Sequence, residues 1–338
     1  MRPDHQNSAV GLVPPLTMPE FDQPLVDLGV VEHPSLAGVL SPSAEAGTPR
    51  QGVNEAFLAN AEEYYRKFTG FDYWADKIRI ACERIGLTEP HVAIEFGAGF
   101  GNASIPFLKR FESCRLIATD ISPNMLAILK RLSVDHGVAE RCVPVAMDAM
   151  KPYVRNDVAD FVFGAAVLHH LVEPGKFVAR AMEILRPGGS AVFFEPMEGG
   201  YALLRMLCLE ILREAERRGA ANEAEMVVTR KIIDSFTPQI FRRRDPNWED
   251  RDDKWVFPRS TLDRIAVDAG ARLSLIPLHD QVAPFRTQFS YLLKTYGGLN
   301  PETYPEWAWD VFNTYDRDSF SQEMLTDLCF ESCLIFSK

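Results

Sequence analysis

The sequence contains no apolar run that approaches the roughly 18 residues needed to cross a lipid bilayer. Its N-terminal residues also lack the continuous apolar core of a secretory signal peptide. These two absences lead us to expect neither membrane insertion nor secretion, and therefore a cytoplasmic protein.

Paired metal-binding or redox cysteines are also missing. The 338 residues include six cysteines, and none of them forms a Cys-x-x-Cys pair. Most lie in apolar surroundings, so we expect buried, reduced thiols. The histidines are scattered apart from the adjacent His169 and His170. Because adjacent side chains seldom point at one ion, we expect no metal site.

Positive charge is in deficit. Lysine and arginine number 36 against 47 aspartates and glutamates, a formal net charge of −11. A nucleic-acid-binding protein needs cations to neutralise phosphates, so this balance argues against such a partner. It favours a small-molecule partner, and it gives no indication of the oligomeric state.

Residues 1–53 differ in composition from the rest. The first 50 residues hold eight of the 23 prolines and only one aromatic residue, Phe21. Proline removes backbone donors and blocks helices. We therefore expect a flexible, mostly extended tail, within which Leu25–Val26 and Val30–Val31 are candidates for short docking segments.

Residues 91–196 alternate between short apolar runs of strand length and helical patterns. Such alternation predicts an α/β fold with a doubly wound parallel sheet and helices on both faces. The expected strands cover residues 91–96, 115–119, 142–147, 159–166 and 190–195.

After Pro196 the alternation stops. We expect one domain over residues 54–338, with a core of residues 90–196 and 259–338 and two largely helical insertions at 197–258 and 279–328. The second insertion is rich in aromatic residues, and we expect both to form a cap beside the ligand cleft. Acidic side chains in the first insertion are expected to pair with nearby arginines on a solvated face: Glu249, Asp250, Asp252 and Asp253.

A glycine-rich turn at residues 92–101 ends the first of these strands and opens a helix. Its spacing is Glu-x-Gly-x-Gly-x-Gly, which differs from the Gly-x-Gly-x-x-Gly of dinucleotide-binding turns. The acid, Glu95, would repel a pyrophosphate but suits a ligand that carries an ammonium group.

The turn resembles motif I of class I S-adenosylmethionine (SAM)-dependent methyltransferases. Further matches follow in the family's order: an acid after the second strand, Asp120; an acid after the third, Asp148; the fourth-strand segment 160–171; and the Pro-Gly-Gly entry to the fifth strand at 187–189. The resemblance covers residues 56–196 well and 259–338 loosely.

This resemblance implies a seven-stranded sheet of order 3-2-1-4-5-7-6 whose last strand is antiparallel, with SAM as cofactor. Asp120 would then bind the ribose and Asp148 the adenine. The expected cofactor-binding residues are Glu95, Gly97, Ala98, Gly99, Gly101, Asp120, Ile121, Asp148 and Ala149.

Candidate catalytic residues follow the fourth and fifth strands. His170, or else His169, is placed to act as a general base, because histidine titrates near neutrality. Glu195 is a candidate for acceptor binding or base catalysis, or for bonding backbone amides at a strand end. Tyr64 and Tyr65 are candidates for lining the acceptor pocket, and ordinary packing is their alternative role.

The sequence thus predicts a methyltransferase that moves the SAM methyl group to a small or medium-sized organic acceptor by in-line displacement. O-methylation is expected before N-methylation and C-methylation. Three alternatives stay open: a nucleotide-dependent oxidoreductase, a non-catalytic SAM-binding protein, and a methyltransferase acting on RNA or protein.

Overall fold

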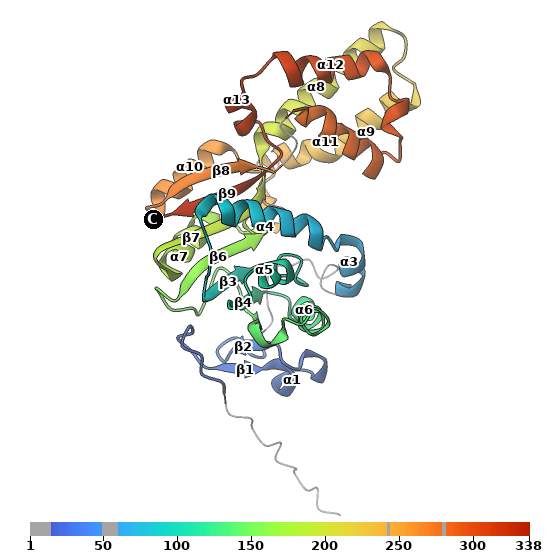
Figure 1. Ribbon diagram of the computed structural model, residues 1–338. Coiled ribbons are helices and arrows are strands. Elements are labelled where there is room, and N and C mark those ends of the chain that lie inside the picture. Colours follow the sequence, from blue (N-terminus) through green and yellow to red (C-terminus); the bar gives the residue numbers. More distant parts are fainter. Residues whose placement is uncertain (1–14, 49–59, 242–243, 279–281) are drawn as a thin grey trace, which may run out of the picture.

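The computed structural model describes residues 15–48, 60–241, 244–278 and 282–338, which form a twisted sheet with helices on both faces (Figure 1). The strands are β1 (Leu25–Asp27), β2 (Leu40–Pro42), β3 (Val92–Phe96), β4 (Arg115–Asp120), β5 (Cys142–Ala146), β6 (Ala159–Ala165), β7 (Leu185–Pro196), β8 (Arg272–Pro277) and β9 (Glu331–Ser337). The α-helices are α1 (Leu28–Val31), α3 (Ala61–Phe68), α4 (Phe71–Ile85), α5 (Ser104–Arg110), α6 (Pro123–Asp135), α7 (Pro174–Ile184), α8 (Glu198–Arg217), α9 (Ala224–Phe241), α10 (Arg259–Asp268), α11 (Pro284–Thr295), α12 (Glu306–Asp318) and α13 (Gln322–Asp327).

The sheet has nine strands within the described residues, in the order β1-β2-β5-β4-β3-β6-β7-β9-β8. The prediction of a seven-stranded sheet was therefore wrong, because two N-terminal strands extend the β5 edge. If the strands from β3 onward are numbered alone, their order reads 3-2-1-4-5-7-6. Strands β3 to β7 run parallel, and β9 is antiparallel to both of its neighbours.

Two apolar cores, one on each face of the sheet, follow from the alternation of side chains along β3. Ile94 packs with α7 and α10 on one face, whereas Ala93 packs with α4, α5 and α6 on the other. Helix α6 begins where the sequence indicates, since the Ser122 side chain accepts a hydrogen bond from the Met125 amide and Pro123 occupies the first turn.

The N-terminal segment is folded where it is described, which corrects the expectation of a flexible tail for residues 15–48. Leu25 and Leu28 are fully buried, and β2 pairs in parallel with β5. The Asp27 carboxylate accepts hydrogen bonds from the Gly29 and Gly38 amides and so holds the turn between β1 and β2. This hairpin covers a sheet edge that would otherwise expose unpaired backbone groups. Residues 1–14 and 49–53 lie outside the described residues.

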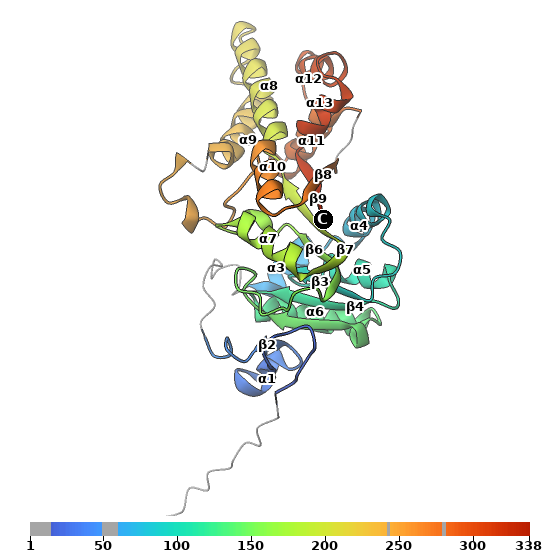
Figure 2. The ribbon, with the colours of Figure 1, turned by 90° about the vertical axis from the view of Figure 1, so that its left-hand side faces the viewer.

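The two insertions form a helical lobe made of α8, α9, α11 and α12, with its own apolar core. Figures 1 and 2 show this lobe beyond the β8–β9 end of the sheet, away from β3, β4 and β5. The aromatic residues of the second insertion mostly pack inside it: Tyr304, Trp309 and Phe312 are buried there. Among the described residues, these four helices contribute none to the ligand cavity, whereas residues 252–254 of the first insertion lie beside the cleft as expected.

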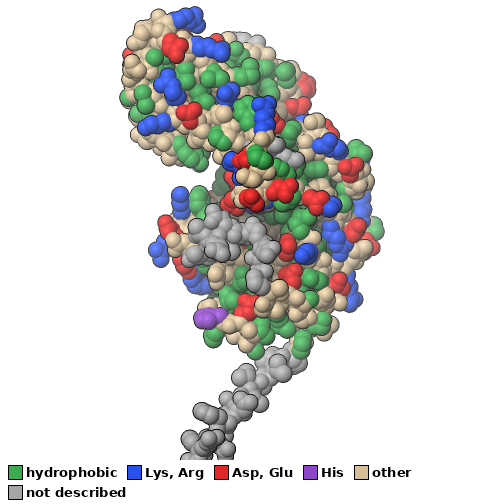
Figure 3. All heavy atoms as spheres, turned by 180° about the vertical axis from the view of Figure 1, so that it is seen from behind, with side chains coloured by type: hydrophobic (Ala, Val, Ile, Leu, Met, Phe, Trp, Pro, Cys, Tyr) green, Lys and Arg blue, Asp and Glu red, His purple; other side chains and the backbone are tan. Residues whose placement is uncertain are grey.

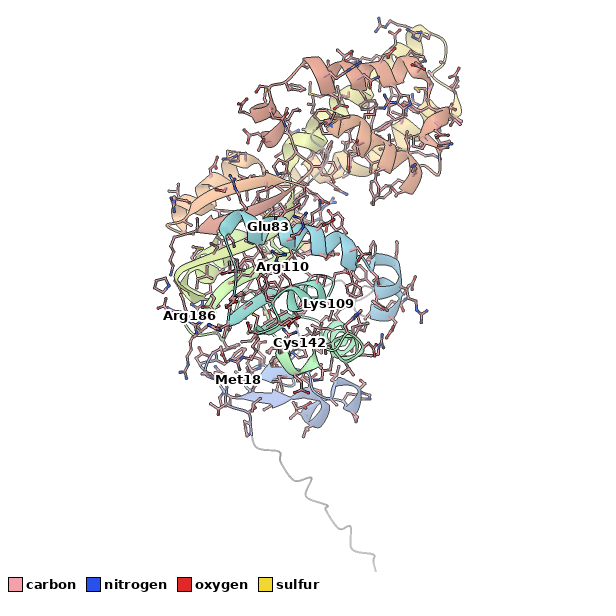
Figure 4. The ribbon with its side chains drawn as sticks, in the orientation of Figure 1. Met18, Glu83, Lys109, Arg110, Cys142 and Arg186 are labelled. Carbon is pink, nitrogen blue, oxygen red and sulfur yellow. The ribbon has the colours of Figure 1, made fainter. Side chains whose placement is uncertain are left out.

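Helix α4 lies across α5 on one face of the sheet. Ile78 and Cys82 of α4 are buried in the shared core, and the side chains of Glu83 and Arg110 lie 3.7 Å apart between the two helices (Figure 4). The exposed ion pair adds little stability, so the apolar contact fixes the helix. All six cysteines are buried and unpaired, as expected. Among the described residues, no helix is both long and apolar enough to cross a membrane.

Candidate active site

A cavity of about 510 Å³ lies at the carboxyl ends of β3, β4, β5 and β6. This is where parallel α/β sheets bind ligands, because the strand order reverses there and the loops diverge. The predicted residues that line it are Tyr64, Glu95, Gly97, Ala98, Gly99, Asp120, Ile121, Asp148, Ala149, His169 and His170. Gly101, Tyr65 and Glu195 do not line it.

The glycine-rich turn forms the floor of the cavity. Gly97 has a φ of 69°, and a Cβ atom there would lie 2.7 Å from Cγ2 of Val167. Gly99 has a φ of 53°, and no atom lies within 4 Å of the position of its missing Cβ. Any side chain at Gly97 would therefore push Val167 aside, whereas Gly99 leaves space for a ligand against the backbone.

Asp120 closes the end of β4. Its Oδ2 accepts a hydrogen bond from the Gly99 amide at 2.8 Å, and its Oδ1 accepts one from the Ser122 amide at 2.8 Å. Burial raises the pKa of this carboxyl, against the lowering effect of the two amides. Asp120 thus ties the glycine turn to β4, and its remaining lone pairs can accept further hydrogen bonds.

Glu95 is buried at the end of β3, with 1% of its surface exposed. The Ser104 hydroxyl donates a hydrogen bond of 2.5 Å to its Oε2. Its Oε1 is buried and has no hydrogen-bond partner among the described residues. Burial raises the pKa of Glu95 to about 8. A buried acceptor without a partner is costly, so this oxygen marks a position that a ligand donor would fill.

Asp148 and Ala149 follow β5 on the cavity wall. Oδ1 of Asp148 accepts a hydrogen bond from the Met150 amide at 2.8 Å, which fixes the carboxylate at the turn. Strand β4 separates β5 from β3 in the sheet. Asp148 and Ala149 therefore lie on the opposite side of the cavity from the glycine turn.

Glu195 does not face the cavity, and the expectation that it binds the acceptor or acts as a base was wrong. It is 1% exposed, and its Oε1 accepts hydrogen bonds from the Val167 and Leu168 amides at 2.9 and 2.7 Å. Its Oε2 lies 2.7 Å from Nδ1 of His169. Glu195 therefore holds the 3-10 turn η3 (Leu168–His170), the structural alternative that the sequence left open.

His169 is held between two carboxylates. Its Nδ1 faces Glu195, and its Nε2 lies 3.4 Å from Oδ1 of Asp253. Burial lowers the pKa of His169, but Glu195 and Asp253 outweigh burial and raise it to about 9. A residue that is protonated at neutral pH cannot accept a proton, so His169 in this state is unsuited to general-base catalysis.

His170 is more exposed and faces the same acidic segment. Its Nδ1 lies 3.1 Å from the Asp252 carbonyl oxygen and 3.7 Å from Oδ1 of Asp253. Burial and the neighbouring His169 lower its pKa. Asp252 and Asp253, expected on a solvated face, are partly exposed and also line the cavity beside the histidines. Asp245 is the acid that pairs with Arg251.

The segment that carries Asp252 and Asp253 is fastened to η3 by its backbone. The amides of Lys254 and Trp255 donate hydrogen bonds to the His169 carbonyl oxygen at 2.7 and 3.1 Å. Although adjacent in the sequence, the two histidines face the same acidic side chain, Asp253. A ligand atom from each of His169, His170 and Asp253 lies within 4.8 Å of the others.

Two aromatic residues complete the cavity wall. Tyr64 of α3 lines it, and burial together with Asp252 and Asp253 raises the pKa of its hydroxyl to about 12. Trp74 of α4 lines it as well. Tyr65 packs edge-on against Phe100, with ring centroids 5.2 Å apart, so the prediction that it lines the pocket was wrong.

The cavity and the strands around it match a known family. A family model described as a methyltransferase domain matches residues 94–193. Residues 94–193 belong to the class I SAM-dependent methyltransferases. The cofactor of this methyltransferase domain is SAM. The match includes the glycine turn, Asp120, Asp148 and the two histidines.

Curated relatives of the methyltransferase domain differ in their acceptors. The chain is 28% identical over 153 residues to malonyl-[acyl-carrier protein] O-methyltransferase of Hahella chejuensis, covering 45% of this chain and 52% of that one. It is 26% identical over 166 residues to dimethylglycine N-methyltransferase of Parasynechococcus marenigrum, covering 47% and 59%. The chain thus spans about half the length of the curated relatives it matches. A phosphoethanolamine N-methyltransferase 2 structure from Haemonchus contortus, in complex with SAM, matches 78% of this chain and 52% of its own, with 15% identity and a TM-score of 0.47.

Several site residues escaped sequence reasoning. Ser104, the partner of Glu95, lies in an ordinary helix start, and nothing in the sequence singles it out. Asp252 and Asp253 lie more than 80 residues beyond the histidines they face. Their signal was the run of acids itself, which is typical of exposed loops and therefore carried little weight.

Proposed function

We propose that this chain transfers the SAM methyl group to a small or medium-sized organic acceptor within the described cavity. The observation that carries the proposal is the buried Oε1 of Glu95, which has no partner among the described residues and lies at the glycine turn. The SAM ammonium is a cationic donor of the kind that this oxygen lacks. The ammonium group of SAM can therefore donate a hydrogen bond to the buried oxygen of Glu95.

The other cofactor contacts follow from the order of the strands. In this proposal Glu95 and the turn at Gly97, Ala98, Gly99 and Gly101 hold the methionine end. Asp120, beside Ile121, accepts hydrogen bonds from the ribose hydroxyls with its free lone pairs. Asp148 and the Ala149 backbone contact the adenine beyond β4. Gly101 would act through the shape of the turn, because it does not line the cavity.

The acceptor would bind on the side of the cavity formed by η3, Tyr64 and Trp74. A cavity of about 510 Å³ lies within the size range of small-molecule sites, roughly 300–1,000 Å³. The net charge of −11 disfavours a nucleic acid as acceptor. We rank O-methylation first, then N-methylation and C-methylation.

The chemistry would rest largely on positioning. SAM supplies a methyl group on a sulfonium, which a nucleophile displaces in line. The residues of the chain would orient the two partners and exclude water. A hydroxyl acceptor would also need to lose a proton, and His170 is the cavity residue best suited to take it.

Binding and transfer can be tested directly. Calorimetric titration with SAM and with NAD separates the methyltransferase from an oxidoreductase, and NAD binding without SAM binding would refute the proposal. Incubation with methyl-labelled SAM and a fractionated cell extract, followed by mass spectrometry, should identify a labelled product of low molecular mass. A label found only on RNA or protein would contradict the proposed acceptor class.

The raised pKa of Glu95 predicts a pH dependence. Because its pKa in the folded state is about 8, folding favours the neutral carboxyl. The stability that this provides is present at pH values below the ordinary carboxyl pKa and is lost as the pH rises through 8. Between pH 6 and pH 9, without SAM, the wild type should lose about 2–3 kcal/mol relative to Glu95→Gln, because each pH unit between 6 and 8 costs about 1.4 kcal/mol. Urea unfolding of both proteins at the two pH values measures this difference, and parallel pH profiles would contradict it.

His170→Ala should lower turnover strongly while leaving SAM affinity nearly unchanged. General-base catalysis contributes about a hundredfold to ten-thousandfold, so we expect a loss in that range if the acceptor is a hydroxyl. Steady-state kinetics and SAM calorimetry measure the two quantities separately. His91→Ala is the matched control, since His91 is exposed at the opposite end of β3. Loss of SAM binding in His170→Ala would indicate a structural role instead.

A further inference from the structure

A group of aromatic side chains between α4 and the helical lobe extends beyond the cavity, and the proposed cofactor contacts do not use it. At its centre is Tyr201, near the start of α8, whose ring packs edge-on against Phe330 with centroids 5.3 Å apart. Burial raises the pKa of the Tyr201 hydroxyl, and four neighbouring acidic or phenolic groups raise it further: Glu331, Tyr296, Tyr291 and Asp253. Tyr201 therefore lies close both to the lobe and to a residue that lines the cavity.

On the side of α4, this group continues the wall of the cavity. Trp74 lines the cavity, and its ring contacts those of Tyr73 and Phe194 edge-on, with centroids 5.3 and 5.5 Å apart. The Tyr73 hydroxyl donates a hydrogen bond of 2.8 Å to Oε2 of Glu331. Burial raises the pKa of Tyr73, and Glu331 and Tyr201 raise it further. Aromatic side chains thus follow one another from the cavity to the base of the lobe.

On the side of the lobe, two tyrosines are exposed. Tyr291 of α11 is 56% exposed, and Tyr296, directly after this helix, is 71% exposed. Figures 1 and 2 show the lobe above α4, and Figure 3 shows the molecule narrowing between the lobe and the sheet, with hydrophobic and acidic side chains at the constriction. We call the aromatic residues on the two sides the α4–lobe surface: Tyr73, Trp74, Tyr201, Tyr291 and Tyr296.

The size of the cavity indicates what this surface would bind. Pockets of roughly 300–1,000 Å³ enclose one drug-sized ligand, and SAM is itself a ligand of that size. A cavity of about 510 Å³ therefore has room for SAM and the reacting group of an acceptor, but not for a second molecule of medium size. The body of such an acceptor would lie outside the cavity, and the α4–lobe surface is continuous with the cavity at Trp74.

The side chains of the surface define the chemistry of this body. Tyrosine and tryptophan rings bind other aromatic rings by edge-on or offset stacking. Glu331 and Asp253 place negative charge beside the surface. The ammonium groups of Lys77 and Lys254 each donate to a backbone carbonyl oxygen, at 2.7 and 2.6 Å. The surface therefore favours an aromatic ligand that is uncharged or cationic, and it repels an anion.

We propose that the α4–lobe surface binds the aromatic body of an uncharged or cationic methyl acceptor, whose reacting group enters the cavity beside Trp74. The proposal rests on the proposed function, because SAM must occupy the cavity for the acceptor to extend outward. It narrows the acceptor to aromatic compounds without negative charge.

Two fluorescent probes that differ by one sulfonate test this proposal. N-phenyl-1-naphthylamine is uncharged, and 8-anilino-1-naphthalenesulfonate is the same ring system with a negative charge. The full-length protein, saturated with SAM, should bind one molecule of the uncharged probe per chain, at least about tenfold more tightly than the sulfonate. Tyr291→Ala should weaken binding of the uncharged probe about threefold to tenfold, as expected for the loss of one aromatic contact, whereas Tyr291→Phe should retain it.

Tyr315→Ala is the matched control. Tyr315 belongs to the same lobe but bonds to Glu210 on α8 and takes no part in the contacts above, so probe affinity should stay within a factor of about two. Displacement of the probe by SAM would place its site inside the cavity and overturn the proposal. Equal affinity in Tyr291→Ala and the wild type, or sulfonate binding as tight as that of the uncharged probe, would overturn it as well.

The methyl-labelled product gives an independent measurement. A product with an aromatic body should be retained by a reversed-phase column and absorb in the ultraviolet, and a labelled product that elutes unretained would contradict the proposed acceptor. SAM calorimetry on the same samples keeps the two proposals separate. Probe binding without SAM binding would refute only the proposed function, and SAM binding without probe binding would refute only the proposed acceptor surface.

Discussion

Glu195→Ala is expected to lower the free energy of unfolding by about 3–5 kcal/mol, the largest stability effect we anticipate for a single residue at this site. The wild-type carboxylate is almost fully buried, and its Oε1 accepts hydrogen bonds from the Val167 and Leu168 amides at the start of η3. It also contacts Nδ1 of His169 through Oε2. Alanine would leave these donors buried and without an acceptor, beside a new cavity. Urea unfolding, followed by circular dichroism, measures the change.

Glu183→Ala is the matched control for this substitution. Glu183 is exposed on α7 and pairs only at the surface with Arg180, so its loss should cost less than about 1 kcal/mol. Glu195→Gln keeps one oxygen acceptor and the side-chain volume, and its stability should fall between those of alanine and the wild type. A Glu195→Ala protein as stable as the control would show that η3 does not depend on this carboxylate.

Asp120→Ala should weaken SAM binding about tenfold to a hundredfold, which corresponds to roughly 1.5–3 kcal/mol for hydrogen bonds to a charged group. Two effects contribute. The proposed ribose acceptor disappears, and the Gly99 amide loses the bond that ties the glycine turn to β4. Calorimetric titration with SAM at pH 7.5 or so measures the affinity directly.

The control for this second substitution is Asp135→Ala, an exposed acid in the last turn of α6 on the helix that follows Asp120. Asp135→Ala removes one negative charge, as Asp120→Ala does, but Asp135 does not line the cavity. SAM affinity should therefore stay within a factor of about two. Unchanged affinity in a folded Asp120→Ala protein would refute the assignment of this residue to the cofactor.

The parallel half of the fold was readable in the sequence because its signals are local. Predicted strands at residues 91–96 and 115–119 correspond to β3 and β4, and Ser122 is the capping serine of α6. Apolar runs, a capping serine and a glycine turn each act within a few residues of one another. The residues on the cavity floor followed from the same local patterns, since each comes directly after a strand.

What the sequence did not show depends on contacts between distant segments. The high proline content of the N-terminal segment disfavours helices but does not prevent short edge strands, so β1 and β2 gave no periodic signal. The acids at 252 and 253 became site residues only because the Lys254 and Trp255 amides bond to the His169 carbonyl. Likewise, no composition rule places Trp74 in the cavity, since an apolar stripe looks the same whether it faces core or ligand.

The N-terminal hairpin also constrains the order in which the parts of the chain can fold. Leu40 of β2 pairs with Val145 of β5, about a hundred residues further along the chain. During synthesis the first folded segment must therefore wait, without its partner, until the third strand of the parallel core has left the ribosome. Its apolar residues Leu25 and Leu28 stay uncovered for that interval. A high proline content then disfavours pairing of the waiting segment with other strands.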